Sequence, residues 1–335
     1  MVKEIENLKE YDSFIGGFYY DGKIKIMSAE IVFVGMSLID VIVQGFVGTP
    51  VSASGYRAES CSVNVGGESV NGVIAAAKLG AKTAILCHLG KDAEGDMVVA
   101  ALEKYGVDVS KIVRDEHPTP VTTMLVEGDG SRKSITNLAH KYNFHPERHL
   151  DALAGAKAIV LGSLFRAPFD EPEIVKAVVE FAHKNNIVVF ADTKIPNFAH
   201  IRLEDIKDSL PLIDYITPNE DEGRFFTGED DPEKMADAFL EYGVKNVIVK
   251  LGGKGCLFKN SEQTIRLAAH KITAVDTTGA GDNFLAAFAA ETLRGESVGD
   301  ALASANACGA ICSTAVGAST ALKDREQVLN FAKTH

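Results

Sequence analysis

The chain has 335 residues, of which 46% are hydrophobic and 24% are charged, so it can bury the large core of a soluble globular protein. Its 34 basic and 46 acidic residues give a formal net charge of −12. This balance argues against nucleic acid as a partner, because proteins that bind nucleic acid concentrate lysine and arginine. An anionic nucleotide would need a local reversal of the field, most simply by a divalent metal ion and backbone N–H groups.

Residues 1–29 mix charged residues with glycine and tyrosine and contain no continuous apolar stretch, so they are not typical of a signal peptide. We interpret them as an N-terminal leader to a domain that spans residues 30–335. The uncharged run Ala301–Leu322 is long enough to cross a bilayer. It consists mainly of small residues with weak transfer energies, so a buried helix followed by a turn is predicted instead.

The cysteines and histidines form no recognisable metal motif. Cys308 and Cys312 lie four residues apart, but no second pair of ligands stands near them. His140, His145 and His149 lie in a loop-like stretch with a spacing that suits no metal. Five separate cysteines without a C-x-x-C pair suit a reducing compartment, so we predict a cytoplasmic protein with no membrane partner.

Apolar, strand-like runs alternate with stretches of helical periodicity along the chain. Several runs are continuous Val, Ile and Leu, as expected of strands that are covered on both faces. This alternation predicts an α/β fold, a doubly wound and mostly parallel sheet with helices on both faces. The predicted strands are 31–34, 83–87, 158–161, 187–191, 215–217, 247–250 and 255–258. The predicted helices are 70–79, 94–105, 173–185, 232–242 and 283–294.

Two regions, residues 41–65 and 119–137, break this rhythm with short alternating strands and polar turns. The second region contains Gly128-Asp129-Gly130, which is a hairpin signal. Strands added to an α/β sheet are candidates for a small lid that excludes water from a reaction. A surface ribbon without a function is the alternative.

The most informative motif is Asp276-Thr277-Thr278-Gly279-Ala280-Gly281-Asp282, which runs directly into the apolar stretch 283–293. A glycine-rich turn before a helix lets an anion approach unpaired backbone N–H groups, so residues 279–281 are predicted to cradle one. A carboxylate repels an anion, so we interpret Asp282 as a proton acceptor beside a transferring phosphoryl group. The alternative is a simple N-cap, because aspartate often starts helices.

Other well-known catalytic motifs are absent from the sequence. Residues 90–92 and 253–255 lack the Ser or Thr of a Walker A motif. Gly35-Met36-Ser37 stands where a dinucleotide fingerprint would follow the first strand. NAD chemistry and P-loop chemistry are therefore disfavoured. A serine hydrolase is disfavoured too, because no G-x-S-x-G motif occurs.

A second group of residues suits the binding of a polyol. Gly66 and Gly67 precede a helix that carries Asn71, so a small ligand can lie against the backbone while the amide contacts hydroxyl groups. Asp40 follows the first predicted strand, near the carboxyl edge of the sheet where ligands bind. A tight turn and a loop-capping aspartate are the alternatives.

Asn219 and Glu222 lie one turn apart at the start of a helix that follows a predicted strand. Such oxygen ligands can hold a hydrated Mg²⁺ near phosphates. A capping box is the alternative, and both interpretations can hold at once. Residues 250–255 form a strand–turn–strand unit in which Gly252 and Gly253 suit backbone contact with a nucleotide.

Together these motifs resemble the ribokinase-like, or PfkB, family of carbohydrate kinases. The run at residues 276–282 is the most specific part of the resemblance. A second part covers residues 66–80 and continues at residues 90–96, and residues 219–222 are the third. The three parts occur in the order typical of the family and span the chain from Ile31 onward.

The resemblance implies a β lid and the ATP-dependent phosphorylation of a hydroxymethyl group on a small ribose- or fructose-like sugar. It implies that Asp282 is the general base and that the N–H groups of Gly279, Ala280 and Gly281 stabilise the charge on the phosphoryl group. A homodimer formed through the lid would also be in keeping with the family.

The other implied roles fall into three groups. The residues implied to hold the sugar are Asp40, Gly66, Gly67 and Asn71. Asn219 and Glu222 would organise Mg²⁺ and the phosphates, partly through water. The residues implied to border the nucleotide are Gly252, Gly253 and Asn306. Many members of the family also bind K⁺, for which the candidates by position are Asp276, Thr278 and Gly317.

The chain departs from the family pattern on the sugar side. Glu68-Ser69-Val70 matches neither the ribokinase nor the fructokinase signature, and Asp192-Thr193-Lys194 replaces the Asp-Pro-Asn of many fructokinase-like members. An anionic acceptor would suit Arg132, Arg166 and Lys194, although solvated surface charges are the alternative. A nucleoside or sugar-acid kinase is therefore the second hypothesis. A catalytically silent sugar- or nucleotide-binding regulator is the third, disfavoured because Asp282 and its glycines are present.

Overall fold

The protein is described from a computed structural model, which covers residues 18–20, 23–25, 29–46, 57–127, 132–137, 144–197 and 199–334. Of the predicted leader, the described part is Ala29 and a pair of short antiparallel strands, β1 (Phe18–Tyr20) and β2 (Lys23–Lys25). The predicted hairpin turn at residues 128–130 lies outside the described residues, as does His140.

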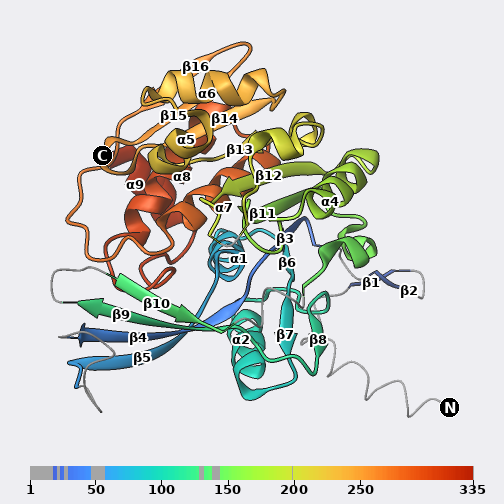
Figure 1. The fold of residues 1–335 in the computed structure, drawn as a ribbon, viewed down its shortest axis with the longest axis vertical. Helices are drawn as coiled ribbons and strands as arrows, with labels where there is room; N and C mark the ends of the chain where they lie inside the picture. The colour runs from blue at the N-terminus through green and yellow to red at the C-terminus, as the bar shows by residue number, and fades with distance from the viewer. Residues whose placement is uncertain are drawn as a thin grey trace.

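An eight-stranded sheet forms the centre of the molecule (Figure 1), in the order β16-β15-β14-β13-β12-β11-β3-β6. The strands from β6 to β14 pair in parallel, and β15 and β16 extend the sheet antiparallel at one edge. This confirms the predicted mostly parallel sheet. The bounds are β3 (Ile31–Val34), β6 (Thr83–Leu86), β11 (Ala158–Leu164), β12 (Val188–Thr193), β13 (Tyr215–Ile216), β14 (Asn246–Lys250), β15 (Cys256–Asn260) and β16 (Thr264–Leu267).

Helices cover both faces of this sheet, which explains why its strands are continuous apolar runs. Successive side chains of a strand point to opposite faces, so Ile31 and Phe33 belong to one hydrophobic cluster while Val32 and Val34 belong to the other. The first cluster is completed by α1 (Glu68–Lys78), α2 (Ala93–Glu103), α7 (Ala280–Leu293) and α8 (Val298–Cys312). The second is completed mainly by α4 (Pro172–Lys184) and α6 (Pro232–Glu241).

Two further helices are α5 (Glu220–Thr227), which follows β13, and α9 (Arg325–Thr334) near the C-terminus. The buried helix predicted within residues 301–322 is confirmed as α8, which ends at Cys312. Among the described helices, none is long and apolar enough to cross a membrane. The five cysteines are all free, and four of them are buried.

A separate four-stranded sheet projects from the base of the central sheet (Figure 1), in the order β10-β9-β4-β5. Its strands are β4 (Leu38–Phe46), β5 (Ser60–Gly66), β9 (Val121–Glu127) and β10 (Arg132–Thr136). They arise from the two regions that were predicted to form a lid, and β4 leads directly on from β3. The short strands β7 (His88–Gly90) and β8 (Val113–Asp115), which the sequence did not predict, pair in parallel with each other.

Candidate active site

The glycine-rich motif forms the first turn of α7. Gly279 is the N-cap residue with a φ of +76°, and a Cβ atom there would lie 2.5 Å from the Cβ of Ala318, so only glycine fits. The helix begins at Ala280, whereas the sequence predicted a start at residue 283. Asp282 is therefore the third residue of the helix, and the alternative that it is the N-cap is wrong.

The backbone of the predicted cradle is partly engaged. The N–H of Ala280 donates to the carbonyl of Thr277 at 3.2 Å, so this donor already has an acceptor. Gly281 lies beside Lys250, whose Nζ atom would be 3.2 Å from a Cβ at that position. The turn thus places its glycines next to a cationic side chain that the sequence analysis had not selected.

Asp282 links the motif to the sugar-side residues. Its Oδ2 atom accepts a hydrogen bond of 2.8 Å from Nδ2 of Asn71, which lies on α1 and is 211 residues away in sequence. Removal from water raises the pKa of Asp282, while Lys194 and the bond from Asn71 act in the opposite direction. A carboxylate with a raised pKa is a stronger base than an exposed one, as proton abstraction requires.

The predicted sugar-binding residues come together around the start of α1. An added Cβ on Gly66 would lie 2.1 Å from Oδ2 of Asp40, and one on Gly67 (φ +98°) would lie 2.5 Å from the carbonyl oxygen of Met36. Glycine is therefore required at residue 67, whereas a side chain at residue 66 would displace the carboxylate of Asp40. Burial raises the pKa of Asp40 to about 6.

Glu68, the first residue of α1, was noted from the sequence only as a departure from the family pattern. Its Oε1 atom accepts a hydrogen bond of 2.8 Å from the N–H of Met36, and its side chain packs against Gly35 and Gly162. Burial raises its pKa to about 7, and the charge of Asp282 acts in the same direction. The sequence-level signal was a carboxylate between the glycine pair and Asn71.

Replacing Glu68 with Gln should remove a pH dependence of stability. Because the folded-state pKa is raised above 4.5 to about 7, the stabilising contribution is complete below pH 4.5 and is lost as the pH rises through 7. The E68Q variant should gain about 2–3 kcal/mol over the wild type between about pH 5 and pH 8. Urea unfolding at both pH values measures this. If the free energies of unfolding of E68Q and the wild type differed by the same amount at both pH values, the prediction would be contradicted. Glu103→Gln, at an exposed position, is the control.

A buried network of charges lies at the carboxyl ends of β12 and β14. Asp192, which is 1% exposed, pairs with Lys250 at 2.5 Å, and Lys194 lies 3.7 Å from its other oxygen. Burial alone would raise the pKa of Asp192, but the two lysines outweigh it and hold the pKa below its ordinary value. The same carboxylate raises the pKa of Lys194.

Asn219 and Glu222 form the capping box of α5. Oδ1 of Asn219 accepts from the N–H of Glu222, and Oε2 of Glu222 accepts from the N–H of Asn219, each at 2.9 Å. Oε2 also accepts from Thr193 at 2.9 Å, while Oε1 lies 4.0 Å from Lys194. The capping interpretation therefore holds, and it leaves Oε1 facing the charge network.

Two buried carboxylate oxygens of the network are candidate ligands for a cation. Within the described ranges, Oδ2 of Asp192 is buried without a hydrogen-bond partner, and Oε1 of Glu222 faces the same Lys194 side chain. Burial and the charge of Asp192 raise the pKa of Glu222. Two carboxylate oxygens of this kind suit Mg²⁺, which prefers oxygen ligands and retains several waters.

A cavity of about 660 Å³ opens beside this network. Its volume lies within the usual range of about 300–1,000 Å³ for small-molecule and cofactor sites. It brings together most of the residues that the resemblance assigned to the nucleotide and the cradle. They are Asn219, Gly252, Gly253, Gly279, Ala280, Gly281, Asp282 and Asn306, joined by Lys194 and Lys250.

The three candidate K⁺ ligands also come together. Oδ1 of Asp276 accepts from the N–H and the hydroxyl of Thr278 at 3.0 and 2.7 Å, and Oδ2 accepts from the N–H of Gly317 at 3.1 Å. Asn283 ties this loop to the motif, because its Nδ2 donates to the carbonyls of Gly279 and Ala318. Within the described residues, its own Oδ1 is buried and has no partner.

Of the three basic residues considered for an anionic acceptor, Lys194 reaches the site network. Arg166 donates from Nε to the carbonyl of Ile195 at 2.7 Å. The side chain of Arg132 lies outside the described residues. The sequence did not identify Lys250 as a site residue, although it lies at the end of a predicted strand next to Gly252 and Gly253.

Comparison with known proteins identifies the family. A model of the pfkB family carbohydrate kinases matches residues 28–325. Ribokinase of Haemophilus influenzae is 28% identical over 278 residues, which are 82% of this chain and 89% of that protein. Probable fructokinase-5 of Arabidopsis thaliana is 30% identical over 275 residues, 77% and 84% of the two chains. The 2-dehydro-3-deoxygluconokinase of Bacillus subtilis is 26% identical over 293 residues, 82% and 89%.

Solved structures lead to the same family. Ribokinase of A. thaliana complexed with ribose and ATP has a TM-score of 0.80 and 28% identity, covering 92% of this chain and all of its own. An E. coli protein described as a ribokinase II, in complex with ATP and Mg²⁺, has a TM-score of 0.74 and 25% identity over the same shares. The chain therefore belongs to the PfkB family of carbohydrate kinases and is a phosphotransferase with an alcohol group as acceptor.

Proposed function

We propose that the protein transfers the γ-phosphoryl group of ATP to a hydroxymethyl group of a small, unphosphorylated sugar. The observation that carries this proposal is the hydrogen bond between Asn71 and Asp282. It joins a polar site around the start of α1 to a cavity of nucleotide size at the start of α7. A base at that junction can reach a hydroxyl from one side and a phosphate from the other.

The Asp282 carboxylate accepts the proton of the attacking hydroxyl group. Asp40 and Asn71 hold neighbouring hydroxyls, and Gly66 and Gly67 allow the sugar to lie against the backbone. The first turn of α7, from Gly279 to Gly281, stabilises the charge on the transferring group, with Lys250 beside it. The N–H of Ala280 would have to exchange Thr277 for the phosphoryl oxygen.

The nucleotide lies in the large cavity, between Gly252–Gly253 and Asn306. Lys194 and Lys250 supply positive charge there, in a chain whose net charge is −12. Asp192 and Glu222 would hold the metal ion, directly or through water. When bound, Mg²⁺ neutralises phosphate oxygens and orients them for in-line transfer.

A monovalent cation is proposed beside the cradle, near Asp276, Thr278 and Gly317. The support is the unpartnered, buried Oδ1 of Asn283 and the carbonyl oxygens of the same loop, among the described residues. Oxygen atoms of this kind suit K⁺. The cation would hold the loop that supports Gly279.

A sugar-acid or nucleoside kinase is the second candidate, and the observed charges weigh against an anionic acceptor. Asp40 lies beside Gly66, and Glu68 is the first residue of α1, so two carboxyl groups line this part of the site, and their ionised forms would repel an anionic acceptor. The positive charge of Lys194 is already shared with Asp192 and Glu222, and that of Lys250 is paired with Asp192. A neutral polyol therefore fits best. A silent regulator is disfavoured, since Asp282 is present.

A homodimer formed through the lid is supported by the register of its strands. Val63 pairs with Val41, Val41 with Thr123, and Thr123 with Ile135, so these side chains form one row on one face. Val63 and Ile135 are 52% and 66% exposed. Contact with a second copy of the chain would remove the apolar surface of this row from water. Sedimentation velocity should therefore show a dimer. The variant Ile135→Lys should weaken it, because a charge would then lie in the contact.

The experiment that tests the function is ADP release with Mg-ATP in K⁺ buffer. The panel comprises ribose, fructose, sugar acids, nucleosides and sugar phosphates, and tetramethylammonium replaces K⁺ in a parallel series. Turnover of one neutral sugar supports the proposal. Turnover of a sugar acid or sugar phosphate alone would contradict it, and so would ATP binding with no turnover of any acceptor.

Replacing Asn71 with Ala should raise KM for the sugar and lower kcat. The amide both contacts the acceptor and holds Asp282, and removing its hydrogen bond raises the pKa of that carboxylate further. The acidic limb of the pH profile of kcat should therefore move to higher pH. KM for ATP should change little. A variant that loses ATP affinity alone would place the sugar site elsewhere.

A further inference from the structure

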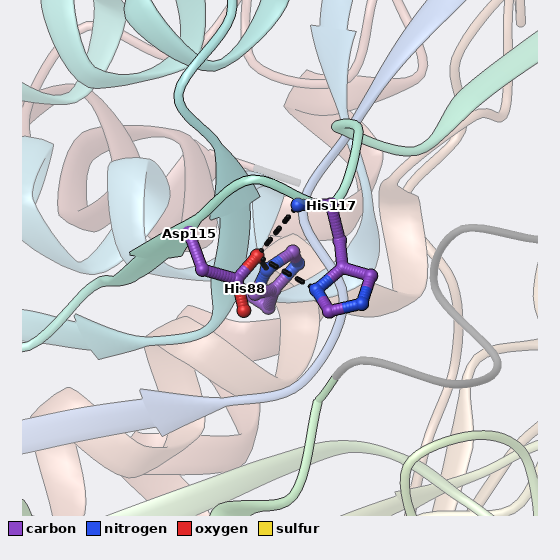
Figure 2. A group of neighbouring side chains, drawn as sticks. All are labelled: His88, Asp115 and His117. Atoms are coloured by element: carbon purple, nitrogen blue, oxygen red, sulfur yellow. Dashed lines mark hydrogen bonds and ion pairs between the residues drawn. The ribbon is translucent and has the colours of Figure 1, made fainter.

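A cluster of two histidines and one aspartate lies at the base of the lid, and none of its members lines the nucleotide cavity. His88 is the first residue of β7, Asp115 is the last residue of β8, and His117 follows in the loop that leads to β9. Figure 2 shows both imidazole rings turned toward the carboxylate of Asp115. One ligand atom from each residue lies within 4.8 Å of the others.

The hydrogen bonds of the cluster fall on a single oxygen atom. Oδ1 of Asp115 accepts from Nε2 of His88 at 2.8 Å, from Nδ1 of His117 at 3.0 Å and from the N–H of His117 at 2.9 Å (Figure 2). A carboxylate oxygen has two lone pairs, so three donors exceed what it can satisfy well. A cation at the meeting point would instead receive lone pairs from the carboxylate and from both neutral rings.

His88 is built into the fold in the way of a metal ligand. Its side chain is 2% exposed, and within the described residues its Nδ1 atom is buried without a partner. If Nε2 binds a cation, the proton resides on Nδ1 and needs an acceptor. A cavity of about 10 Å³, lined by His88 together with Ser37 and Pro120, has space for about one water molecule in that role.

We propose that His88, Asp115 and His117 bind a divalent transition-metal ion of the Zn²⁺ class. Two imidazoles and one carboxylate are ligands typical of Zn²⁺, whereas Mg²⁺ prefers an all-oxygen shell. The side chains of Asp115 and His117 are 42% and 61% exposed, so a fourth position is open to water. This site shares no residue with the Mg²⁺ site that is proposed at Asp192 and Glu222.

The position of the cluster suggests what the ion does. His88 follows β6 of the central sheet, while the loop with Asp115 and His117 runs on through Thr119 into the lid strand β9. That loop is already held at the start of α2, because Thr119 donates to the N-cap residue Asp92 through both its N–H and its hydroxyl. An ion would add a second link and fix the base of the lid.

The test is a titration of the tag-free, full-length protein with Zn²⁺, and separately with Co²⁺, in buffer without Mg²⁺ or nucleotide. Calorimetry should show one site per chain, and the visible absorption of bound Co²⁺ should indicate nitrogen ligands. His117→Gln and Asp115→Asn, at exposed positions, should each weaken this binding by at least about tenfold. His145→Gln is the control, because His145 pairs with Glu147 elsewhere in the chain.

One site that is lost in both variants and kept in the control supports the assignment. Binding that is unchanged in His117→Gln would overturn it, as would binding only at millimolar Zn²⁺. Circular dichroism of each variant establishes that the fold is intact, so that a loss of binding reports on the ligands. Because no nucleotide or sugar is present, the outcome is independent of the proposed kinase activity.

Discussion

Replacing Asp282 with Asn is expected to lower kcat by roughly 10²–10⁴, which is the usual contribution of a positioned general base. The amide has nearly the same shape and still accepts the hydrogen bond from Asn71, but it cannot take a proton from the sugar hydroxyl. KM for ATP should change little, because the glycines of the first turn of α7 and the lysines of the cavity are untouched.

The pH profile separates a base from a merely structural aspartate. Removal from water raises the pKa of Asp282 above 3.8, the ordinary value for aspartate. The acidic limb of the pH profile of kcat/KM should therefore have its midpoint above pH 3.8. This limb should disappear in D282N. Asp300, an exposed aspartate in the first turn of α8, provides the matched control D300N. Turnover in D282N that resembles the wild type would remove Asp282 from the mechanism.

The sheet was predictable because burial on both faces leaves a direct trace in the sequence. Strands such as β3 and β11 must be apolar at every position when helices cover both sides, and such runs are easily recognised. The edge strand β16 was not predicted, since its alternating exposure resembles that of a polar loop. Strand β13 has only two residues, yet it was predicted, because the motif with Asn219 and Glu222 directly follows it.

The start of α7 shows why boundaries are harder to predict. A glycine-rich turn predicts a helix, but the first helical residue depends on which glycine takes the left-handed conformation. That choice is made by Ala318, which leaves no room for a side chain at residue 279. Ala318 lies 39 residues further along the chain, so the sequence around the motif carries no sign of it.

The charge network escaped prediction for a related reason. Asp192, Lys194 and Lys250 come from two strands and a loop, and each alone reads as an ordinary charged residue at a strand end. These residues meet only because the parallel sheet brings the carboxyl ends of β12 and β14 to the same edge. The cluster at the base of the lid is similar, because 27 residues separate His88 from Asp115 and no local spacing signals a ligand set.

Replacing Lys250 with Met is expected to lower the free energy of unfolding by about 3 kcal/mol, the scale for removing one partner of a buried ion pair. The side chains of Lys250 and Asp192 are only 12% and 2% exposed, so the remaining carboxylate would be left in a poorly solvated position. Lys194, at 3.7 Å, compensates only in part. Urea unfolding at neutral pH measures the loss.

The double variant D192N/K250M should recover most of that stability, because it removes the unpaired charge while the amide can still accept the hydrogen bond from Thr217. The loss in K250M should also shrink at acid pH, since protonation neutralises Asp192 without its partner. Lys207→Met, which breaks an exposed pair with Glu204, is the control and should leave stability unchanged. If K250M and the double variant were equally unstable, the effect would come from lost packing, and the ion pair would not be what holds these strand ends together.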